Sequence, residues 1–218
     1  MTVDKYSRPG TKLSRVKGVV IHYVGNPGSS AEGNRNYFEG LKYGSTGTYA
    51  SAHYIIGQKG DVIKCIPTSE MAYHVGSKTY KAEAVKKLSD YPNDCTIGIE
   101  CCHPDSTGEP TAPTYNSMVT LAKQLCEAFG LNPATDLYLH HDITGKDCHR
   151  YFVANPKAWE NFKRDVAGHK IPAEHKGNVD QLVKAGIIGA PELWYDTSNI
   201  QPANIEALIN KMAGYISK

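Results

Sequence analysis

Apolar and β-branched residues cluster in four short runs that are separated by polar, turn-forming residues. The runs lie within residues 17–28, 51–67, 95–102 and 136–141. Runs of this length and composition predict buried strands, and His22 lies near the end of the first one. The second run is interrupted by a glycine-containing turn at residues 58–60, so we expect it to form a β-hairpin.

The segments between these runs have helical patterns. They cover residues 29–41, 82–90, 114–130 and 155–168. In the third segment the apolar residues recur at the spacing of one helical stripe, and Gly130 follows as a C-cap. Strands interleaved with helices predict an α/β domain over residues 1–168, with a central mixed β-sheet flanked by helices.

The rest of the chain has a different character. Residues 169–176 are polar and contain a proline, which is typical of a linker. Residues 177–218 carry short helical patterns separated by turn residues, so we expect a small helical C-terminal module. A segment of about 40 residues is marginal for a hydrophobic core of its own, so the module is either a tail that packs on the first domain or a binding unit.

Composition and charge argue against some classes of partner. Charged residues make up 21% of the chain and the formal net charge is +2, so bulk electrostatics does not favour nucleic acid. No apolar run approaches the ~20 residues that span a bilayer, so no membrane insertion is expected. Residues 1–15 lack the apolar core of a secretory signal, and we therefore expect synthesis in the cytoplasm.

Six cysteines lie at irregular spacings and form no CxxC pair, which excludes a zinc ribbon and a thioredoxin-type motif. Five of them are interpreted as reduced, buried residues with a structural role: Cys65, Cys95, Cys101, Cys102 and Cys126. Cys148 differs from these five because histidines, aspartates and a lysine surround it in the segment "LHHDITGKDCHR", residues 139–150.

That segment suggests a metal site, since a catalytic zinc ion generally has three protein ligands and one open position. His22, His140 and Cys148 could provide such a set. Taken alone the signal is weak, because a histidine in a strand is more often a core residue and a His/Cys pair eight residues apart is often incidental.

Five motifs, in this order and at these separations, resemble a known family. They are "VVIHYVGNPG", "SAHYIIGQKGDV", "AYHVG", "IGIECC" and "HHDITGKDC". Together they are similar to the zinc amidases of the type-2 N-acetylmuramoyl-L-alanine amidase family, over roughly residues 15–165. This family shares its fold with the peptidoglycan-recognition proteins and with phage lysozyme-like amidases.

The resemblance implies a zinc ion (Zn²⁺) held by His22, His140 and Cys148. It places the second ligand at His140 rather than His141, because the family's histidine stands six residues before a lysine and eight before a cysteine. The substrate it implies is bacterial peptidoglycan, at the amide bond between N-acetylmuramic acid and L-alanine of the stem peptide.

The resemblance also implies the catalytic roles. Glu100 matches the glutamate that acts as base in the lysin-like branch, and Lys146 matches the residue on the oxyanion side. Another branch has a tyrosine in this catalytic region, but the corresponding position here is Ala52, so this sequence departs from that version. His74 and Tyr73 match the aromatic-histidine segment along the substrate groove, although the family usually has tryptophan at the position of Tyr73.

Other polar residues near the motifs receive supporting roles. Asp142 is expected to orient a ligand histidine through its second ring nitrogen. His53 is expected to be a structural or groove-wall residue rather than a ligand. His141 and His149 are expected to lie behind the ligands or at the surface.

Three alternatives stay open at this point. A non-catalytic peptidoglycan-binding protein could share the fold, although such relatives typically lose the cysteine ligand. A cysteine hydrolase with Cys148 as nucleophile would need no metal. A structural zinc ion would call for a fourth protein ligand.

The two-part layout without a secretory signal favours a phage endolysin, released through a membrane pore or by lysis, over a bacterial autolysin. In that context the C-terminal module at residues 177–218 could bind the cell wall.

Overall fold

The computed structural model describes residues 1–168 and 182–187 of the chain. The chain forms two compact units, Met1–Lys163 and Arg164–Lys218. Of the second unit, residues 182–187 include one helical turn at 182–184. The predicted linker at 169–176 and most of the predicted module at 177–218 lie outside the described residues, so the domain boundaries and the wall-binding role stay predictions.

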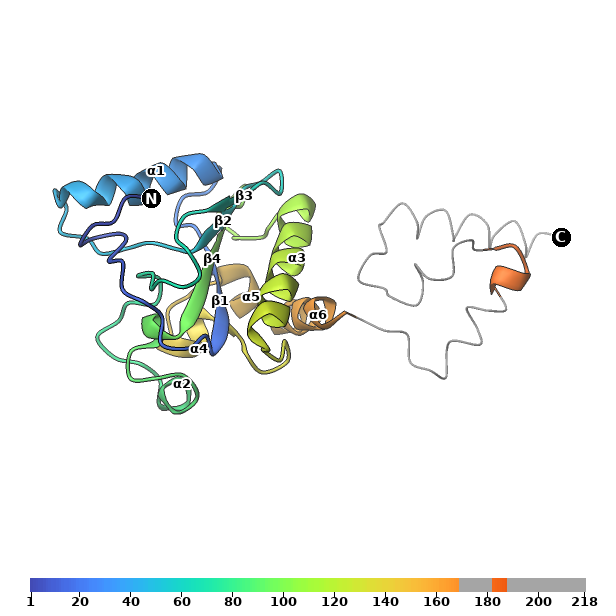
Figure 1. The fold of residues 1–218 in the computed structure, drawn as a ribbon. Helices are drawn as coiled ribbons and strands as arrows, with labels where there is room; N and C mark the ends of the chain where they lie inside the picture. The colour runs from blue at the N-terminus through green and yellow to red at the C-terminus, as the bar shows by residue number, and fades with distance from the viewer. Residues whose placement is uncertain (169–181, 188–218) are drawn as a thin grey trace. The chain divides into compact units, whose positions relative to one another are not determined.

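A five-stranded mixed sheet with the strand order β3-β2-β4-β1-β5 forms the centre of the first unit (Figure 1). Its strands are β1 (Gly18–Tyr23), β2 (Tyr54–Ile56), β3 (Val62–Lys64), β4 (Thr96–Cys101) and β5 (Leu137–Leu139). The strands β2, β4, β1 and β5 are parallel, and the hairpin partner β3 is antiparallel. Parallel strands are usually covered on both faces, which explains why β1 and β4 read as near-continuous apolar runs.

The register of the sheet places two polar residues side by side at its centre. His22 of β1 is the partner of Glu100 of β4. On β1, His22 shares a face with Val20, and Ile21 points to the other face, because side chains alternate along a strand. The sheet therefore presents a histidine and a carboxylate from neighbouring strands on the same face, near the carboxyl ends of both strands.

Helices cover the sheet. They are α1 (Ala31–Gly40), α2 (Ala82–Lys87), α3 (Ala112–Phe129), α4 (His140–Thr144), α5 (Arg150–Ala154) and α6 (Pro156–Ala167), with 3-10 turns η1 (Leu41–Tyr43) and η2 (Pro92–Asp94). In Figure 1, α3 lies on one side of the sheet and α2 lies on the other. The side-chain oxygen of Ser30 caps α1 by accepting from Gly33 N, and Thr111 caps α3 by accepting from Thr114 N.

The predicted fold class is confirmed over the first unit, where a mixed sheet is flanked by helices. Gly130 ends α3 with a φ of +64°, as predicted for a C-cap. One local expectation is wrong. The run at 136–141 was expected to form a strand that includes His140, but β5 ends at Leu139 and His140 is the first residue of α4. The short helix α5 was also not predicted.

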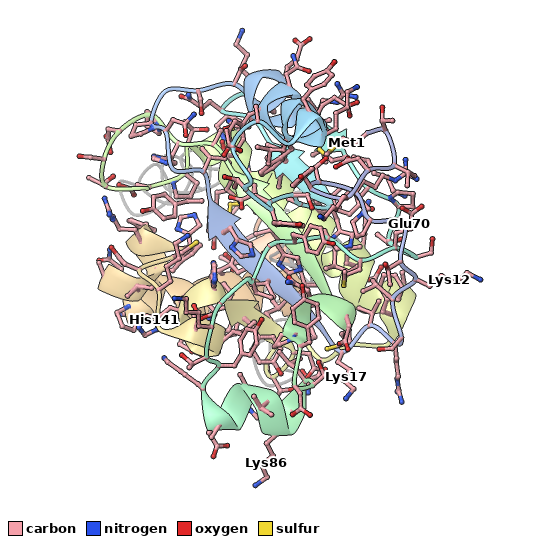
Figure 2. All side chains as sticks on the ribbon, turned by 90° about the vertical axis from the view of Figure 1, so that its left-hand side faces the viewer. Met1, Lys12, Lys17, Glu70, Lys86 and His141 are labelled. Atoms are coloured by element: carbon pink, nitrogen blue, oxygen red, sulfur yellow. The ribbon has the colours of Figure 1, made fainter. Side chains whose placement is uncertain are left out.

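The N-terminal segment is fixed along one side of the molecule. The Arg8 guanidinium donates to both carboxylate oxygens of Glu70 at 2.7 and 2.8 Å, and the Met1 ammonium donates to Cys65 O. Figure 2 shows Met1, Glu70 and Lys12 on one side of the view and His141 on the other.

Among residues 1–168 and 182–187, none of the helices combines the length and the apolar composition that a membrane span requires.

Candidate metal centre

The carboxyl ends of β1 and β5 bring two histidines together. These strands are parallel neighbours, with Ile21 opposite Leu139. The residue that follows Ile21 is His22, and the residue that follows Leu139 is His140, the first residue of α4. The two rings lie 4.9 Å apart between centroids in an edge-on arrangement. In an α/β sheet, binding sites commonly lie at the carboxyl ends of parallel strands.

A tight turn after α4 returns the chain to this point. Gly145 adopts a φ of +83° at the end of α4, a left-handed conformation that glycine adopts without steric cost. The backbone then pairs back on itself, because His141 N donates to Cys148 O at 2.7 Å. This turn places the Cys148 sulfur next to His22, with Sγ and Nδ1 3.6 Å apart.

The three predicted ligands converge. One ligand atom from each of His22, His140 and Cys148 lies within 4.8 Å of the other two, and all three residues are buried. His140 Nε2 is shielded from solvent and has no hydrogen-bond partner within the described part of the chain. A buried polar atom without a partner costs about 1–3 kcal/mol, so a ligand atom left bare in this way fits a metal site.

The protonation states of the three residues also fit a cation site. Burial lowers the pKa of His140 to about 4 and that of His22 well below its usual value, with charged neighbours acting in the same direction. Both rings are therefore neutral at pH 7 and can offer a lone pair. Burial raises the pKa of Cys148 to about 12, so this residue is a thiol until a cation displaces its proton.

Two further groups with charge chemistry lie in the same pocket. Glu100 lines it from β4, and Lys146 lines it from the turn between α4 and Cys148. Burial raises the pKa of Glu100 to about 8, and the nearby positive charge of Lys146 opposes this shift. Glu100 Oε2 is buried and has no hydrogen-bond partner among the described residues, so this carboxyl group is available to a ligand.

His74 and Tyr73 both line the pocket, but they differ in what they contact. His74 is 6% exposed, and its Nδ1 lies 3.1 Å from His22 Nε2. The ring of Tyr73 packs edge-on against Tyr49, with centroids 5.6 Å apart. Tyr73 therefore belongs to an aromatic wall, whereas His74 is in contact with a candidate ligand.

His53 lies outside the ligand group, as expected. It is fully buried; its Nδ1 accepts from Gly98 N and its Nε2 donates to Glu70 O. Ala52, the position where another branch has tyrosine, is also fully buried. The interpretation of His53 as a structural residue agrees with these contacts.

Asp142 does not make the contact that was expected of it. Its Oδ2 accepts from Leu139 N at 2.8 Å, and its Oδ1 lies 4.0 Å from His141 Nδ1. The carboxylate thus caps the start of α4 and faces a histidine that is not in the ligand group. His149 lies behind the site, fully buried between the rings of Tyr23 and Phe152.

The sequence interpretation missed part of the pocket wall. Tyr37, Tyr49 and Asn34 also line the pocket, and the two tyrosines are 55% and 48% exposed. A tyrosine on a polar helix such as α1 was the available signal, since large aromatic side chains exposed on the surface often mark a binding site.

The fold and the site together define a class: an α/β protein that can hold one metal ion beside a carboxyl group and an ammonium group. Residues 12–151 match the family described as N-acetylmuramoyl-L-alanine amidase. The chain therefore belongs to this family, and the resemblance seen in the five motifs is confirmed.

Individual relatives agree with this assignment. The chain is 36% identical over 170 residues to the N-acetylmuramoyl-L-alanine amidase BlyA of Bacillus subtilis (strain 168), a match that covers 75% of this chain and 44% of BlyA. It is 31% identical over 186 residues to the amidase CwlL of Bacillus licheniformis, covering 84% of this chain and 50% of CwlL. The chain thus spans about half the length of the curated relatives it matches.

A solved structure of a mutant endolysin from Bacillus subtilis has the same fold. The TM-score is 0.57 at 20% sequence identity, and the match covers 75% of this chain and 94% of the endolysin. At this level of identity the likeness concerns the fold alone.

Proposed function

We propose that this chain is a zinc-dependent N-acetylmuramoyl-L-alanine amidase. It hydrolyses the amide bond between the lactyl carbonyl of N-acetylmuramic acid and the amine of L-alanine in the peptidoglycan stem peptide. The observation that carries the proposal is the convergence of His22, His140 and Cys148 within 4.8 Å, next to Glu100 and Lys146 in one pocket. Family membership supports the choice of substrate.

The three converging residues would hold the metal ion. Two imidazole nitrogens and one thiolate are ligands that suit zinc, and three protein ligands leave one coordination position for water or substrate. When bound, zinc supplies a Lewis acid that lowers the pKa of water to around 7 and polarises a carbonyl oxygen, and its charge favours the ionised form of nearby carboxylates.

Glu100 is the proposed general base. A water molecule attacks the lactyl carbonyl carbon, and the Glu100 carboxylate accepts the proton that the water loses. The same carboxyl group then donates this proton to the departing alanine amine, which balances the reaction. The pKa of Glu100 suits this exchange. An acid–base group works best with a pKa near the working pH, and burial raises the pKa of Glu100 to about 8.

Lys146 is the proposed oxyanion-side residue. As water adds to the carbonyl carbon, negative charge develops on the carbonyl oxygen, and a fixed ammonium nearby stabilises that charge. Lys146 lies two residues before the ligand Cys148 in a turn fixed by the His141–Cys148 backbone bond. Its location is therefore tied to that of the metal ligands.

Tyr73 is proposed to bind substrate as part of an aromatic wall. Tyr37 of α1, Tyr49 and Tyr73 all line the pocket, and the rings of Tyr49 and Tyr73 pack edge-on. Tyrosine rings offer an apolar face and a polar hydroxyl, a combination that suits a sugar ring bearing a peptide. His74, which was expected to share this role, lines the same pocket.

The proposal is tested by digesting purified Gram-positive cell wall with the full chain. New N-terminal alanine and new sugar reducing ends are quantified separately, with and without a zinc chelator. Free alanine amines that disappear with chelator and return with added zinc are expected. Reducing ends in their place would indicate a glycosidase, and chelator-resistant cleavage blocked by thiol alkylation would indicate a cysteine hydrolase. Wall binding without any cleavage would indicate a recognition protein.

The biological setting that we propose is cell-wall lysis, with the enzyme acting as an endolysin or an autolysin. In the endolysin case it would reach the wall after release through a phage-encoded membrane pore. Two kinds of experiment distinguish the settings. The purified protein is added to whole cells from outside, or it is expressed inside the cells, either alone or together with a pore-forming protein, and lysis is measured. Lysis only when the pore is present is the result expected of an endolysin.

A further inference from the structure

The orientation of His22 is decided by a chain of hydrogen bonds that begins away from the metal site. The Thr96 hydroxyl lies 2.6 Å from the carbonyl oxygen of Pro92. A carbonyl oxygen can only accept, so the Thr96 hydroxyl donates to it. Thr96 Oγ1 is therefore an acceptor toward its other neighbour, which is His74 Nε2 at 3.2 Å.

The direction of the next bond follows. His74 Nε2 also lies 3.3 Å from the carbonyl oxygen of Thr96, which again only accepts. Both contacts require a proton on His74 Nε2. His74 is buried, and its ring nitrogens face His22 and Thr96, neither of which offers a carboxylate; a buried charge without a counter-charge is costly, so the ring takes its neutral form. A neutral imidazole carries one N–H, so His74 Nδ1 has a bare lone pair.

That lone pair faces the candidate ligand. His74 Nδ1 is 3.1 Å from His22 Nε2, so His22 Nε2 carries the proton and donates it. His22 is buried as well, and in its neutral ring the remaining nitrogen, Nδ1, is bare. This is the nitrogen that lies 3.6 Å from the Cys148 sulfur. The relay from Pro92 thus ends with a lone pair directed into the ligand cluster.

The surrounding sequence is built around the His74 ring. Asn93 Oδ1 accepts from His74 N at 3.0 Å and from Val75 N at 2.9 Å, and Asn93 is fully buried. On β4, a Cβ atom at Gly98 would lie 2.5 Å from His74 Cγ. The ring therefore occupies the space that a side chain at position 98 would need. The two hydrogen bonds to Asn93 Oδ1 fix the backbone at His74.

We propose that His74 is a positioning residue for the metal ligand His22. By accepting from His22 Nε2, it selects the tautomer in which Nδ1 is bare, and it fixes the ring with that atom directed at the metal. This role deepens the proposed zinc-amidase function and rests on it. It also replaces the expectation that His74 binds substrate, since both of its ring nitrogens are already engaged within the protein.

Two variants separate positioning from simple space filling. His74→Leu introduces an apolar side chain of similar size and removes the acceptor Nδ1. His74→Asn retains an oxygen close to the position of Nδ1. Groups that orient a metal ligand typically change metal affinity about 10–100-fold. We expect His74→Leu to weaken zinc binding by about that factor, and His74→Asn to recover most of the loss.

Zinc affinity is measured by competition with a chromophoric chelator, on full-length protein whose melting temperature is recorded alongside. Equal zinc affinity in wild type and His74→Leu would overturn the proposal. So would an equal loss in the Leu and Asn variants when both are folded. If the Leu variant does not fold, His74→Asn is compared with Thr96→Val instead. Removing the Thr96 hydroxyl is expected to weaken zinc binding by a smaller factor than the one expected for His74→Leu.

The tautomer of His22 gives a second readout that does not depend on activity. Long-range ¹H–¹⁵N correlation spectra are expected to show the His22 proton on Nε2, both in zinc-free and in zinc-loaded protein. A proton on Nδ1 would contradict the relay. A protein that binds zinc and shows this tautomer but releases no alanine from cell wall would disprove the amidase function and leave the role of His74 intact.

Discussion

Two groups of buried histidines lie within one domain and have opposite surroundings. His53 and His103 are satisfied by the protein itself: His53 bonds to Gly98 N and Glu70 O, and both nitrogens of His103 lie within 2.8 Å of a backbone carbonyl oxygen. In the second group, one ring nitrogen of His22 and one of His140 lie within 4.8 Å of each other and of the Cys148 sulfur. Burial is the same in both groups, so the partners of the ring nitrogens distinguish scaffold from site.

His149 shows the limit of this criterion. It is fully buried, and neither of its ring nitrogens has a hydrogen-bond partner in the described part of the chain. Yet it packs against aromatic rings and does not belong to the converging ligand group. A bare nitrogen indicates a metal site only where other ligand atoms converge on the same point.

Removing a ligand is expected to have the largest effect. In Cys148→Ser and His140→Ala, zinc content should fall and release of alanine from cell wall should drop below detection. Zinc-binding free energies of about 10–16 kcal/mol shared over four ligands imply a loss of at least about 70-fold in affinity for each ligand removed. His141→Ala is the matched control on the same helix, and it should keep both zinc and activity.

Glu100→Gln tests the base without touching the ligands. We expect kcat to fall by about 100- to 10,000-fold, the range typical of a lost acid–base group, while zinc content stays at one ion per chain. The measurement is alanine release under saturating substrate, with metal analysis of the same sample. Full activity in the glutamine variant would remove Glu100 from the reaction.

Lys146→Met should lower kcat by about 100-fold if the ammonium stabilises an oxyanion. A second consequence follows from charge: Lys146 lowers the pKa of Glu100, so its removal should move the acidic limb of the pH–rate profile to higher pH. The control is Lys86→Met, because Lys86 points away from the body of the protein on α2 (Figure 2). An unchanged acidic limb would argue against electrostatic contact between the two groups.

Zinc affinity should rise with pH by about tenfold per unit between pH 5 and 8. Burial raises the pKa of Cys148 to about 12 in the metal-free protein, so binding as a thiolate must release one proton. His140, with a pKa of about 4, is already neutral in this range and releases none. The titration is best done in the Glu100→Gln background, and a flat profile there would mean that Cys148 is not a ligand.

The smallest effect on the site is expected from the scaffold histidine. His53→Gln should leave zinc affinity within about twofold of wild type. It should reduce the free energy of unfolding by about 1–3 kcal/mol at pH 7.5, because Gly98 N loses its acceptor. Chemical denaturation of both proteins measures this difference.

The pH dependence of that difference has a defined sign. Burial lowers the pKa of His53 to about 4, whereas the unfolded chain has the usual value near 6.5. Between these pH values the unfolded state binds the extra proton, so stability is lost as the pH falls from 6.5 toward 4, by up to about 1.4 kcal/mol per unit. The gap between wild type and His53→Gln should therefore shrink in acid.

The sequence contained enough to predict the sheet and the identity of the candidate ligands, but not how the site is assembled. Short apolar, β-branched runs and amphipathic segments indicated the strands and the long helices correctly, because those signals are local. The start of α4 at His140 was missed, since its cap depends on Asp142 bonding backwards to Leu139, and a five-residue helix leaves no periodicity to detect.

Contacts between distant segments were beyond reach for a related reason. The hydrogen bond between His22 and His74 joins residues 52 positions apart. The segment "AYHVG" does not indicate which ring nitrogen of its histidine is hydrogen-bonded. The space for its ring comes from Gly98 on a third segment. Sequence motifs thus named the residues, whereas their orientation depends on packing among strands that meet only in the folded chain.

The pairing of His22 with Glu100 across β1 and β4 also separates what is rigid in this protein from what can vary. Neighbouring strands lie about 4.8 Å apart, so the spacing between base and ligand is a dimension of the sheet rather than of any loop. The tyrosines that line the pocket come from α1 and from loops. Under the proposed function, substitutions at Tyr37, Tyr49 and Tyr73 are therefore expected to change substrate preference while His22 and Glu100 keep their separation.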